Sequence, residues 1–289
     1  MRFSLVLATV DRTYELGRFL YHLDQQSCRD FELIIVDQNT EDILLPVLEP
    51  YSDSFPLIHL RSLQRGVSRA RNLGIKYARG EIIGFPDDDC WYHPDCLDNI
   101  SKFFARHRKW DGLSGCTINS AGIHSLSRYD ARAGEINSFN IWCRTTASSL
   151  FLRKYVVESV AGFNEELGGG SGTPFGSSED IDYPLQAIKK GFKIFYNPEF
   201  KVYHPDPYSC LEEKAFKRVY FYGIGMGRVL RKHQYPFWFL LYYLARALGG
   251  LTIGIVSGNS AKIKYHFLSF KGRVYGWKYP DKCTSAGEI

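Results

Sequence analysis

The 289-residue sequence has few cysteines, and they lack the spacing of a metal or redox motif. No C-x-x-C pair occurs, and an odd number of cysteines in a chain of this length does not fit a disulfide framework. We therefore expect mostly reduced thiols in a cytosolic protein. The seven residues are Cys28, Cys90, Cys96, Cys116, Cys143, Cys210 and Cys283.

The sequence also lacks a block of positive charge. Its formal net charge is +5, and Lys and Arg are scattered along the chain. A nucleic-acid-binding protein normally gathers such residues on one face or in one segment, so nucleic acid is not an expected partner. Anionic small molecules and anionic lipids stay open as partners.

An export signal is missing from the first residues. In MRFSLVLATVDR the apolar run is short and ends at Asp11, whereas a signal peptide needs a longer apolar core. Internal repeats are absent too. With 45% hydrophobic residues the chain is long enough to bury a sizeable core, so a globular enzyme is possible.

Short apolar runs alternate with helical patterns in the first hundred residues. Nearly continuous apolar runs are typical of strands that are buried on both faces of a parallel sheet. The alternation predicts βαβ units and a doubly wound α/β layer. The expected strands are residues 4–9, 32–37, 56–60 and 81–85.

The pattern changes after residue 99. Strands are expected at residues 112–119 and 145–153, followed by a glycine-rich loop. A helix is expected to begin at Ser178, which can cap it, with acidic residues in the first turn. Two further strands, 192–197 and 200–204, complete this part.

Polar residues follow several of the predicted strands. In open α/β sheets, ligands bind outside the carboxyl ends of the strands. Thr9, Asp37 and the triplet Asp87, Asp88 and Asp89 fall at those ends. This placement predicts a binding site, and solvated loop acids are the simpler alternative.

The three adjacent carboxylates repel one another, so keeping them ionised requires a nearby positive charge. A divalent cation supplies it, and oxygen ligands suit Mg²⁺ or Mn²⁺. The alternative is that the acids cap the next helix, where Pro94 is expected in the first turn.

Arginines stand in the same half of the sequence. Arg65, Arg69 and Arg71 precede or open the helix expected over residues 67–78. An arginine there can bind a diphosphate through two hydrogen bonds. We expect this of Arg71, because the acid triplet follows one strand later, and a solvated basic face at Arg69.

Five segments resemble, in order and spacing, the bacterial family two glycosyltransferases of the GT-A fold. They are SLVLATVDR, DFELIIVDQNTED, RGVSRARNLGIKYARGEIIGFPDDD, AGFNEEL and GSSEDIDYPLQAIKKGFKIFYNPEFKVYH. The resemblance implies an α/β fold with a Rossmann-like, mostly parallel sheet. Residues 1–105 would form the nucleotide-sugar-binding half, 106–205 the acceptor-binding and catalytic half, and 206–289 a helical tail that associates with a membrane.

The resemblance implies a donor site as well. Thr9 and Asp37 would frame the nucleotide base, Arg71 would meet the diphosphate, and Asp87 would face the ribose. The family commonly has a second Asp after the residue that matches Asp37. Here Gln38 stands in its place, which leaves the nucleotide open.

Metal and catalytic residues follow from the same resemblance. Asp89 ends a D-x-D motif and would hold Mn²⁺ or Mg²⁺, and His204 either completes that site or is a structural histidine. Asp180 is the expected general base, with Glu179 beside it. The alternative for these two acids is that they only decorate a helix N-terminus.

The longest apolar stretch is residues 236–256, which approaches the ~20 residues of a bilayer span. Arg246 lies near its centre, where a charge costs ~2.5–3.5 kcal/mol in a spanning helix. We expect helices that lie in the interface of an anionic leaflet. An apolar hairpin that covers the catalytic domain is the alternative.

These features predict an inverting, metal-dependent transferase that adds one sugar, from a UDP-sugar, to a lipid-linked oligosaccharide. The setting would be bacterial surface polysaccharide synthesis on the cytoplasmic face of the membrane. The Q-x-x-R-W element of processive synthases is absent. The alternatives are a sugar-phosphate nucleotidyltransferase and a non-catalytic nucleotide-sugar-binding protein.

Overall fold

The computed structural model describes residues 2–206 and 213–279, and the chain divides into two compact units. The first unit comprises Met1–Gly172 and Glu179–Ser209. The second comprises Thr173–Ser178 and Cys210–Ile289. The predicted boundary at residue 206 lies close to this division. The boundary between the two predicted halves, at residue 105, stays a prediction, because one sheet runs through both.

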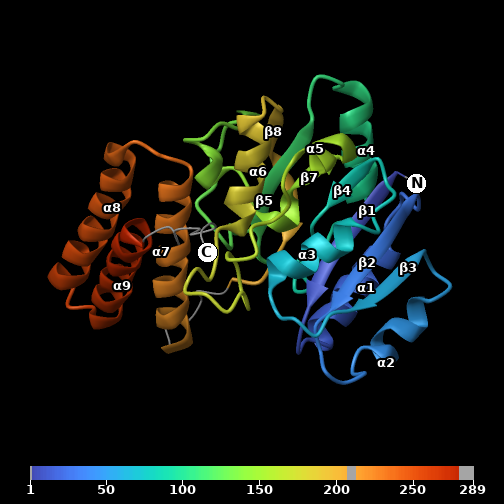
Figure 1. The fold of residues 1–289 in the computed structure, drawn as a ribbon, viewed down its shortest axis with the longest axis horizontal. Helices are drawn as coiled ribbons and strands as arrows, with labels where there is room; N and C mark the ends of the chain where they lie inside the picture. The colour runs from blue at the N-terminus through green and yellow to red at the C-terminus, as the bar shows by residue number, and fades with distance from the viewer. Residues whose placement is uncertain (1, 207–212, 280–289) are drawn as a thin grey trace, which may run out of the picture. The chain divides into compact units, whose positions relative to one another are not determined.

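Eight strands form that sheet in the order β3-β2-β1-β4-β7-β5-β8-β6 (Figure 1). The first four in the chain run parallel to one another, and β5 is parallel to β8. The short β6 and β7 run antiparallel to theirs. The predicted α/β fold with a mostly parallel sheet is confirmed. The strands are β1 (Phe3–Thr9), β2 (Phe31–Asp37), β3 (Leu57–Arg61), β4 (Ile82–Gly84), β5 (Gly112–Ile118), β6 (Gly134–Glu135), β7 (Phe151–Arg153) and β8 (Ile194–Tyr203).

Helices connect the strands and cover the sheet. They are α1 (Tyr14–Asp24), α2 (Leu45–Leu48), α3 (Val67–Ile75), α4 (Cys96–Arg106), α5 (Lys154–Ser159) and α6 (Glu179–Lys189). Short 3-10 turns occur at Glu49–Tyr51, Ile141–Cys143 and Ala147–Ser149.

The continuous apolar run of β1 reflects burial on both of its faces. Phe3, Leu5 and Leu7 belong to a buried cluster with residues of α1 and α4. Val6 points the other way, toward α3, where a Cβ on Gly74 would lie 2.5 Å from its Cγ1. Glycine at position 74 therefore lets α3 pack closely on the sheet.

Three local predictions need correction. The helix α6 begins at Glu179, directly after the expected cap residue Ser178, but the φ of Ser178 is 70°, whereas an N-cap residue typically adopts the extended region. Residues 192–197 and 200–204 form one strand, β8, which continues through Pro198 with a shift in its register to β5. Ala147–Ser149 is a 3-10 turn rather than strand, and Ser149 Oγ donates to the Gly115 carbonyl.

The second unit contains three helices, α7 (Glu213–Lys232), α8 (Phe237–Val256) and α9 (Ser260–Lys278). Buried glycines line the contact between α7 and α9, among them Gly223 and Gly227 on α7 and Gly272 and Gly276 on α9. Small residues of this kind allow two helix backbones to approach closely. By length and composition, α8 is able to cross a membrane.

Cysteines of the first unit are free thiols. They are Cys28, Cys90, Cys96, Cys116 and Cys143, whereas Cys210 and Cys283 lie outside the described residues.

Candidate active site

The candidate site lies at the carboxyl ends of the central strands. Thr9 ends β1, Asp37 ends the neighbouring β2, and the acid triplet follows β4 on the other side of β1. An isolated parallel bridge between Ala8 and Asp87 continues the pairing into the triplet. The predicted gathering of polar residues at one edge is therefore present.

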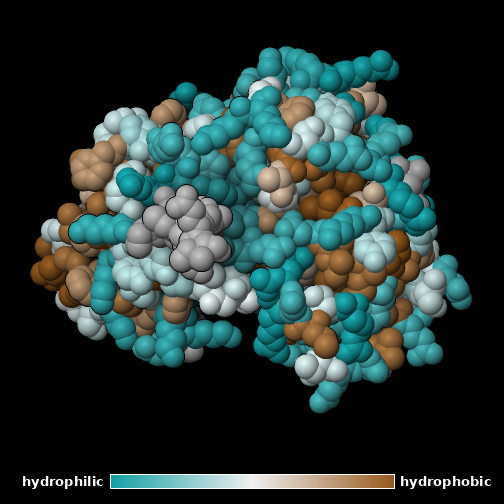
Figure 2. Space-filling view, viewed as in Figure 1, coloured by the Kyte–Doolittle hydropathy of each residue, from teal (hydrophilic) through white to brown (hydrophobic). Residues whose placement is uncertain are grey.

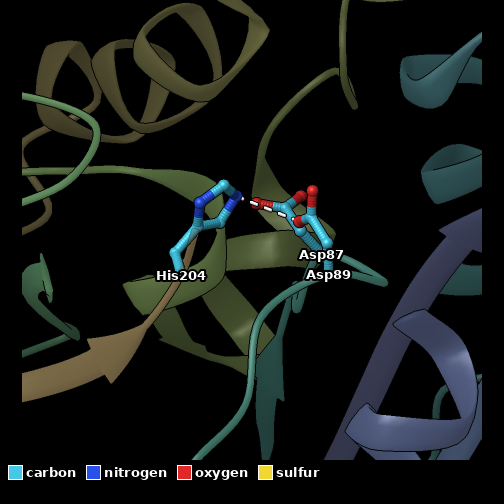
Figure 3. A group of neighbouring side chains, drawn as sticks. All are labelled: Asp87, Asp89 and His204. Carbon is cyan, nitrogen blue, oxygen red and sulfur yellow. Dashed lines mark ion pairs between the residues drawn. The ribbon is translucent and has the colours of Figure 1, made fainter. Parts of the chain in front are cut away.

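Asp87, Asp89 and His204 form a cluster whose potential ligand atoms all lie within 4.8 Å of one another (Figure 3). His204 Nε2 lies 3.0 Å from Asp89 Oδ1. Two carboxylate oxygens and an imidazole nitrogen are a donor set that suits Mn²⁺. These three residues therefore fit a divalent cation.

Electrostatics distinguish the two carboxylates. Burial tends to raise the pKa of Asp89, but hydrogen bonds and charge from His204 and Arg12 outweigh it and hold the pKa below its usual range. Burial raises the pKa of Asp87, although Arg71 opposes this. The partnership with Asp89 raises the pKa of His204 against its burial. The pair therefore favours the ionised form of Asp89 and the protonated form of His204.

Arg12 is a site residue that the sequence reasoning missed. Its Nη1 lies 2.7 Å from Asp88 Oδ1 and 2.6 Å from Asp89 Oδ2. Three adjacent acids require a nearby cation, and Arg12 is the first cation after the end of β1, so this signal was present in the sequence. Arg12 supplies positive charge to two of the three acids.

Asp88 is also part of the site. Besides Arg12, it accepts a 2.7 Å hydrogen bond from Thr9 Oγ1. Burial raises the pKa of Asp88 to about 6 despite these partners. Thr9 therefore holds Asp88 in this structure, and its predicted contact with a nucleotide base stays a prediction.

Arg71 connects the triplet to helix α6. Its side chain is 2% exposed, and its Nη2 lies 2.8 Å from Asp87 Oδ1 and its Nη1 3.4 Å from Glu179 Oε1. A buried guanidinium between two carboxylates supplies positive charge to both. The predicted contact of Arg71 with a diphosphate stays a prediction, because both of its partners here belong to the chain.

Glu179 and Asp180 open α6, where the positive end of the helix dipole favours acids. Burial raises the pKa of both carboxyls, and the charge of Glu179 adds to the effect on Asp180, whose pKa is about 8. Gly168, with φ 95°, lies against the Glu179 carboxyl, where a Cβ would come within 3.0 Å of Cδ. The predicted acid pair therefore lies half-buried beside the glycine-rich loop.

Asp37 is fully buried at the end of β2. Its Oδ1 accepts from the Asn39 backbone and side-chain nitrogens at 2.8 and 2.7 Å, and its Oδ2 lies 3.0 Å from His59 Nε2. Gln38 is also buried and accepts from the Gly66 backbone nitrogen at 2.7 Å. His59 was missed because it lies on the neighbouring strand β3, and Asn39 was missed although it follows Asp37 by only two residues.

A comparison with protein families finds that residues 4–157 match the model of "Glycosyl transferase family 2". The match includes Thr9, Asp37, Arg71 and the acid triplet. Asp180 and His204 lie beyond it.

Among curated proteins, the chain is 32% identical over 229 residues to the uncharacterized glycosyltransferase YfnE of Bacillus subtilis. That alignment covers 78% of this chain and 55% of YfnE, so the chain spans about half the length of this relative. It is 24% identical over 254 residues to the glycosyltransferase AglE of Haloferax volcanii, covering 83% of this chain and 74% of AglE.

Among solved structures, residues 1–349 of S. aureus TarS match with a TM-score of 0.63 and 18% identity, covering 95% of this chain and 90% of that one. The mannosyltransferase PcManGT from Pyrobaculum calidifontis, in complex with GDP-Man and Mn²⁺, matches with a TM-score of 0.67 and 15% identity. That match covers 95% of this chain and 86% of PcManGT. These likenesses show a shared fold.

Proposed function

The chain belongs to glycosyl transferase family 2, and on this premise we propose that it transfers one sugar, with inversion, from a nucleotide diphosphate sugar to an acceptor hydroxyl. The observation that carries the proposal is a set of contacts that joins the candidate metal site to the acid pair of α6. Asp89 and His204 fit a cation, and Arg71 connects the neighbouring Asp87 to Glu179, which adjoins Asp180.

We propose a UDP-sugar as the donor. TarS, which shares this fold, has been crystallised in complex with UDP and with UDP-GlcNAc, both at a TM-score of 0.59 to this chain. PcManGT was crystallised with GDP-Man instead. Gln38 Oε1 accepts a hydrogen bond from the Gly66 backbone nitrogen in this structure.

Asp89 and His204, with Asp87 beside them, would hold Mn²⁺ or Mg²⁺. The bound cation supplies positive charge to the diphosphate as it leaves. Arg12 contributes further positive charge beside Asp89. The backbone of His204 is fixed to β5, because its backbone nitrogen donates to the Ile118 carbonyl at 2.8 Å.

Asp180 would act as the general base. Its carboxylate accepts the proton of the acceptor hydroxyl while the oxygen bonds to the anomeric carbon and the bond from that carbon to the diphosphate breaks. A carboxyl with a pKa of about 8 is a stronger base than an ordinary aspartate once it is ionised. Arg71, which pairs with the neighbouring Glu179, adds positive charge near Asp180.

We further propose that the acceptor is a lipid-linked oligosaccharide, reached from the cytoplasmic face of the membrane, in the synthesis of a bacterial surface polysaccharide. The strongly cationic helices of the second unit support contact with anionic lipids.

The test is incubation of the full chain with Mn²⁺ and a panel of UDP-glucose, UDP-GlcNAc and GDP-mannose. We expect at least one UDP-sugar to raise the thermal midpoint and to be hydrolysed slowly to UDP, and GDP-mannose to do neither. If none of the three donors binds or is cleaved, the proposed function is wrong.

A further inference from the structure

The helix α8 has two different faces. One face is buried within the second unit and includes Phe239, Leu240, Tyr243, Ala247 and Gly254. The opposite face is exposed, although it is made of apolar side chains. Its residues recur every three to four positions and lie along one side of the helix.

We call this exposed face the α8 stripe and define it by Leu241, Tyr242, Leu248, Ile255 and Val256. Their exposed fractions are 47%, 50%, 49%, 57% and 83%. Ala245 and Thr252 lie between them and are exposed as well. In Figure 2 the apolar side chains of α8 gather at the left edge of the view. A run of exposed apolar residues along a 20-residue helix is too long to be an incidental surface feature.

The charge of the second unit indicates what covers the stripe. From Glu213 to Tyr279 the chain has twelve Lys and Arg and a single acid, Glu213. The formal charge of the whole chain is only +5, so the rest of the molecule is net acidic. A cationic helical unit around an apolar stripe matches an anionic lipid surface, since basic residues bind the headgroups and apolar ones the acyl boundary.

A cation lies at the border of the stripe. Arg246 is exposed halfway along α8, with its guanidinium 5.7 Å from the Tyr242 ring centroid. Side chains of this length reach from an apolar surface to the headgroup layer.

We propose that the α8 stripe binds an anionic phospholipid bilayer, with the helix lying parallel to the membrane plane. A parallel orientation follows from the asymmetry of α8. The face that includes Leu240 and Ala247 is occupied by protein, so lipid reaches the helix from one side, and Arg246 lies at mid-helix, where a spanning orientation would bury its charge. The proposal does not depend on sugar transfer, because membrane binding is measured without any donor.

Flotation of the full chain with vesicles tests this proposal. We expect most of the protein to float with vesicles of equal parts phosphatidylglycerol and phosphatidylcholine, and about tenfold less with phosphatidylcholine alone. An alkaline carbonate wash should release the bound protein. Equal binding to both vesicle types, or retention after the wash, would overturn the proposal.

Matched variants identify the surface. Leu248→Glu, and Leu241→Glu combined with Ile255→Glu, should lower binding to anionic vesicles by about tenfold or more, because each places a negative charge in the stripe. Ile123→Glu is the control, since Ile123 is 64% exposed in the first unit. Leu248→Gln adds no charge and is therefore a milder substitution at the same position, in case Leu248→Glu misfolds. It should weaken binding by a smaller factor. Unchanged binding of the stripe variants, or an equal loss in the control, contradicts the assignment.

A second copy of the chain is the other possible occupant. Sedimentation velocity without lipid tests for such a dimer. If the wild-type chain is a dimer and Leu248→Glu dissociates it, the stripe binds protein and the proposal is overturned. We expect the wild-type chain and this variant to sediment alike.

Discussion

Trp91 and Tyr203 are joined by two backbone hydrogen bonds and a parallel ring stack. The Trp91 nitrogen donates to the Tyr203 carbonyl at 2.9 Å, and the Tyr203 nitrogen donates back at 3.0 Å. The ring centroids lie 5.3 Å apart at an interplanar angle of 6°. Because Asp89 comes two residues before Trp91 and His204 follows Tyr203, this bridge brings the two parts of the candidate metal site together.

Trp91 is also held from its other side. The guanidinium of Arg18 lies 4.1 Å from the Trp91 ring centroid, and Arg18 Nη2 donates to the Asp89 carbonyl at 2.8 Å. We therefore expect Trp91→Leu to weaken Mn²⁺ binding by about 10-fold or more, as loss of a group that orients metal ligands does. Trp91→Phe should recover most of the affinity. Electron paramagnetic resonance of free Mn²⁺ measures it, and an unchanged dissociation constant for Trp91→Leu would refute the positioning role.

Arg12 and a metal ion would share the carboxylate of Asp89. Replacing Arg12 with Gln removes a cation that lies 2.6 Å from Asp89 Oδ2. We expect Arg12→Gln to bind Mn²⁺ about threefold or more tightly in the absence of nucleotide, because like charges compete for one carboxylate. Arg65→Gln is the control, since Arg65 pairs with Asp11 on the surface. Weaker Mn²⁺ binding by Arg12→Gln, measured by the same resonance titration, would show that Arg12 supports the metal instead.

Asp180→Asn tests the general base. Turnover should fall by about 100-fold or more, while the affinity for the donor stays nearly unchanged. In the wild-type protein the rate should rise with pH as Asp180 ionises, with a midpoint of at most about 8, because a bound cation lowers this pKa. A pH profile of initial rates measures this, and a rate that falls between pH 6 and 8 would exclude the role.

Asp180→Asn, which should lower turnover, should raise the stability of the folded chain at high pH. The pKa of Asp180 is raised in the folded chain, so the folded state binds more protons than the unfolded state between the ordinary aspartate value and about 8. Stability is therefore lost as the pH rises through this window. Asp180→Asn removes that loss, and its thermal midpoint at pH 9 should exceed the wild-type value by about 2 °C or more.

Gly74→Ala tests the packing of α3 on the sheet. A Cβ at this position would lie 2.5 Å from Val6 Cγ1 and 3.2 Å from Val36 Cγ2. We expect a loss of about 1–3 kcal/mol in the free energy of unfolding, from overpacking. Gly17→Ala is the matched helical control, because its Cβ would meet Val47 at an ordinary 3.7 Å, and it should stabilise by about 0.5–1 kcal/mol. Urea denaturation followed by circular dichroism compares the two, and equal effects would contradict this account.

The strands and helices of the first half were predictable from the sequence, because a strand buried on both faces leaves a continuous apolar run. β1 and β2 match their predicted positions to within a residue. The errors arose where local chemistry competes with pattern. Pro198 suggested a break that the sheet tolerates, and the hydroxyl-rich residues 147–149 bond to nearby backbone instead of extending a strand.

Part of the site was predictable for the same reason. Strand ends place Asp37 and the triplet on one edge of the sheet. The structure brings together Asp89 and His204, the two expected metal ligands, and adds Asp87, which was expected to face the ribose. His59 was not found, because its contact with Asp37 depends on the pairing of β2 with β3, whereas Arg12 and Asn39 follow strand ends closely in the sequence and were overlooked. The separation of Arg71 from solvent was also beyond sequence reasoning, since an arginine near a helix start is usually exposed.

We propose that Asp89 anchors a cation on which binding of a nucleotide diphosphate depends. Titration calorimetry measures UDP binding to the wild-type chain, first with Mn²⁺ and then with EDTA. The same titration is made with the Asp89→Ala variant. We predict tight binding only for the wild type with Mn²⁺, and a loss of about 10-fold or more in the variant or in EDTA. Equal UDP affinity in all of these conditions would contradict the account.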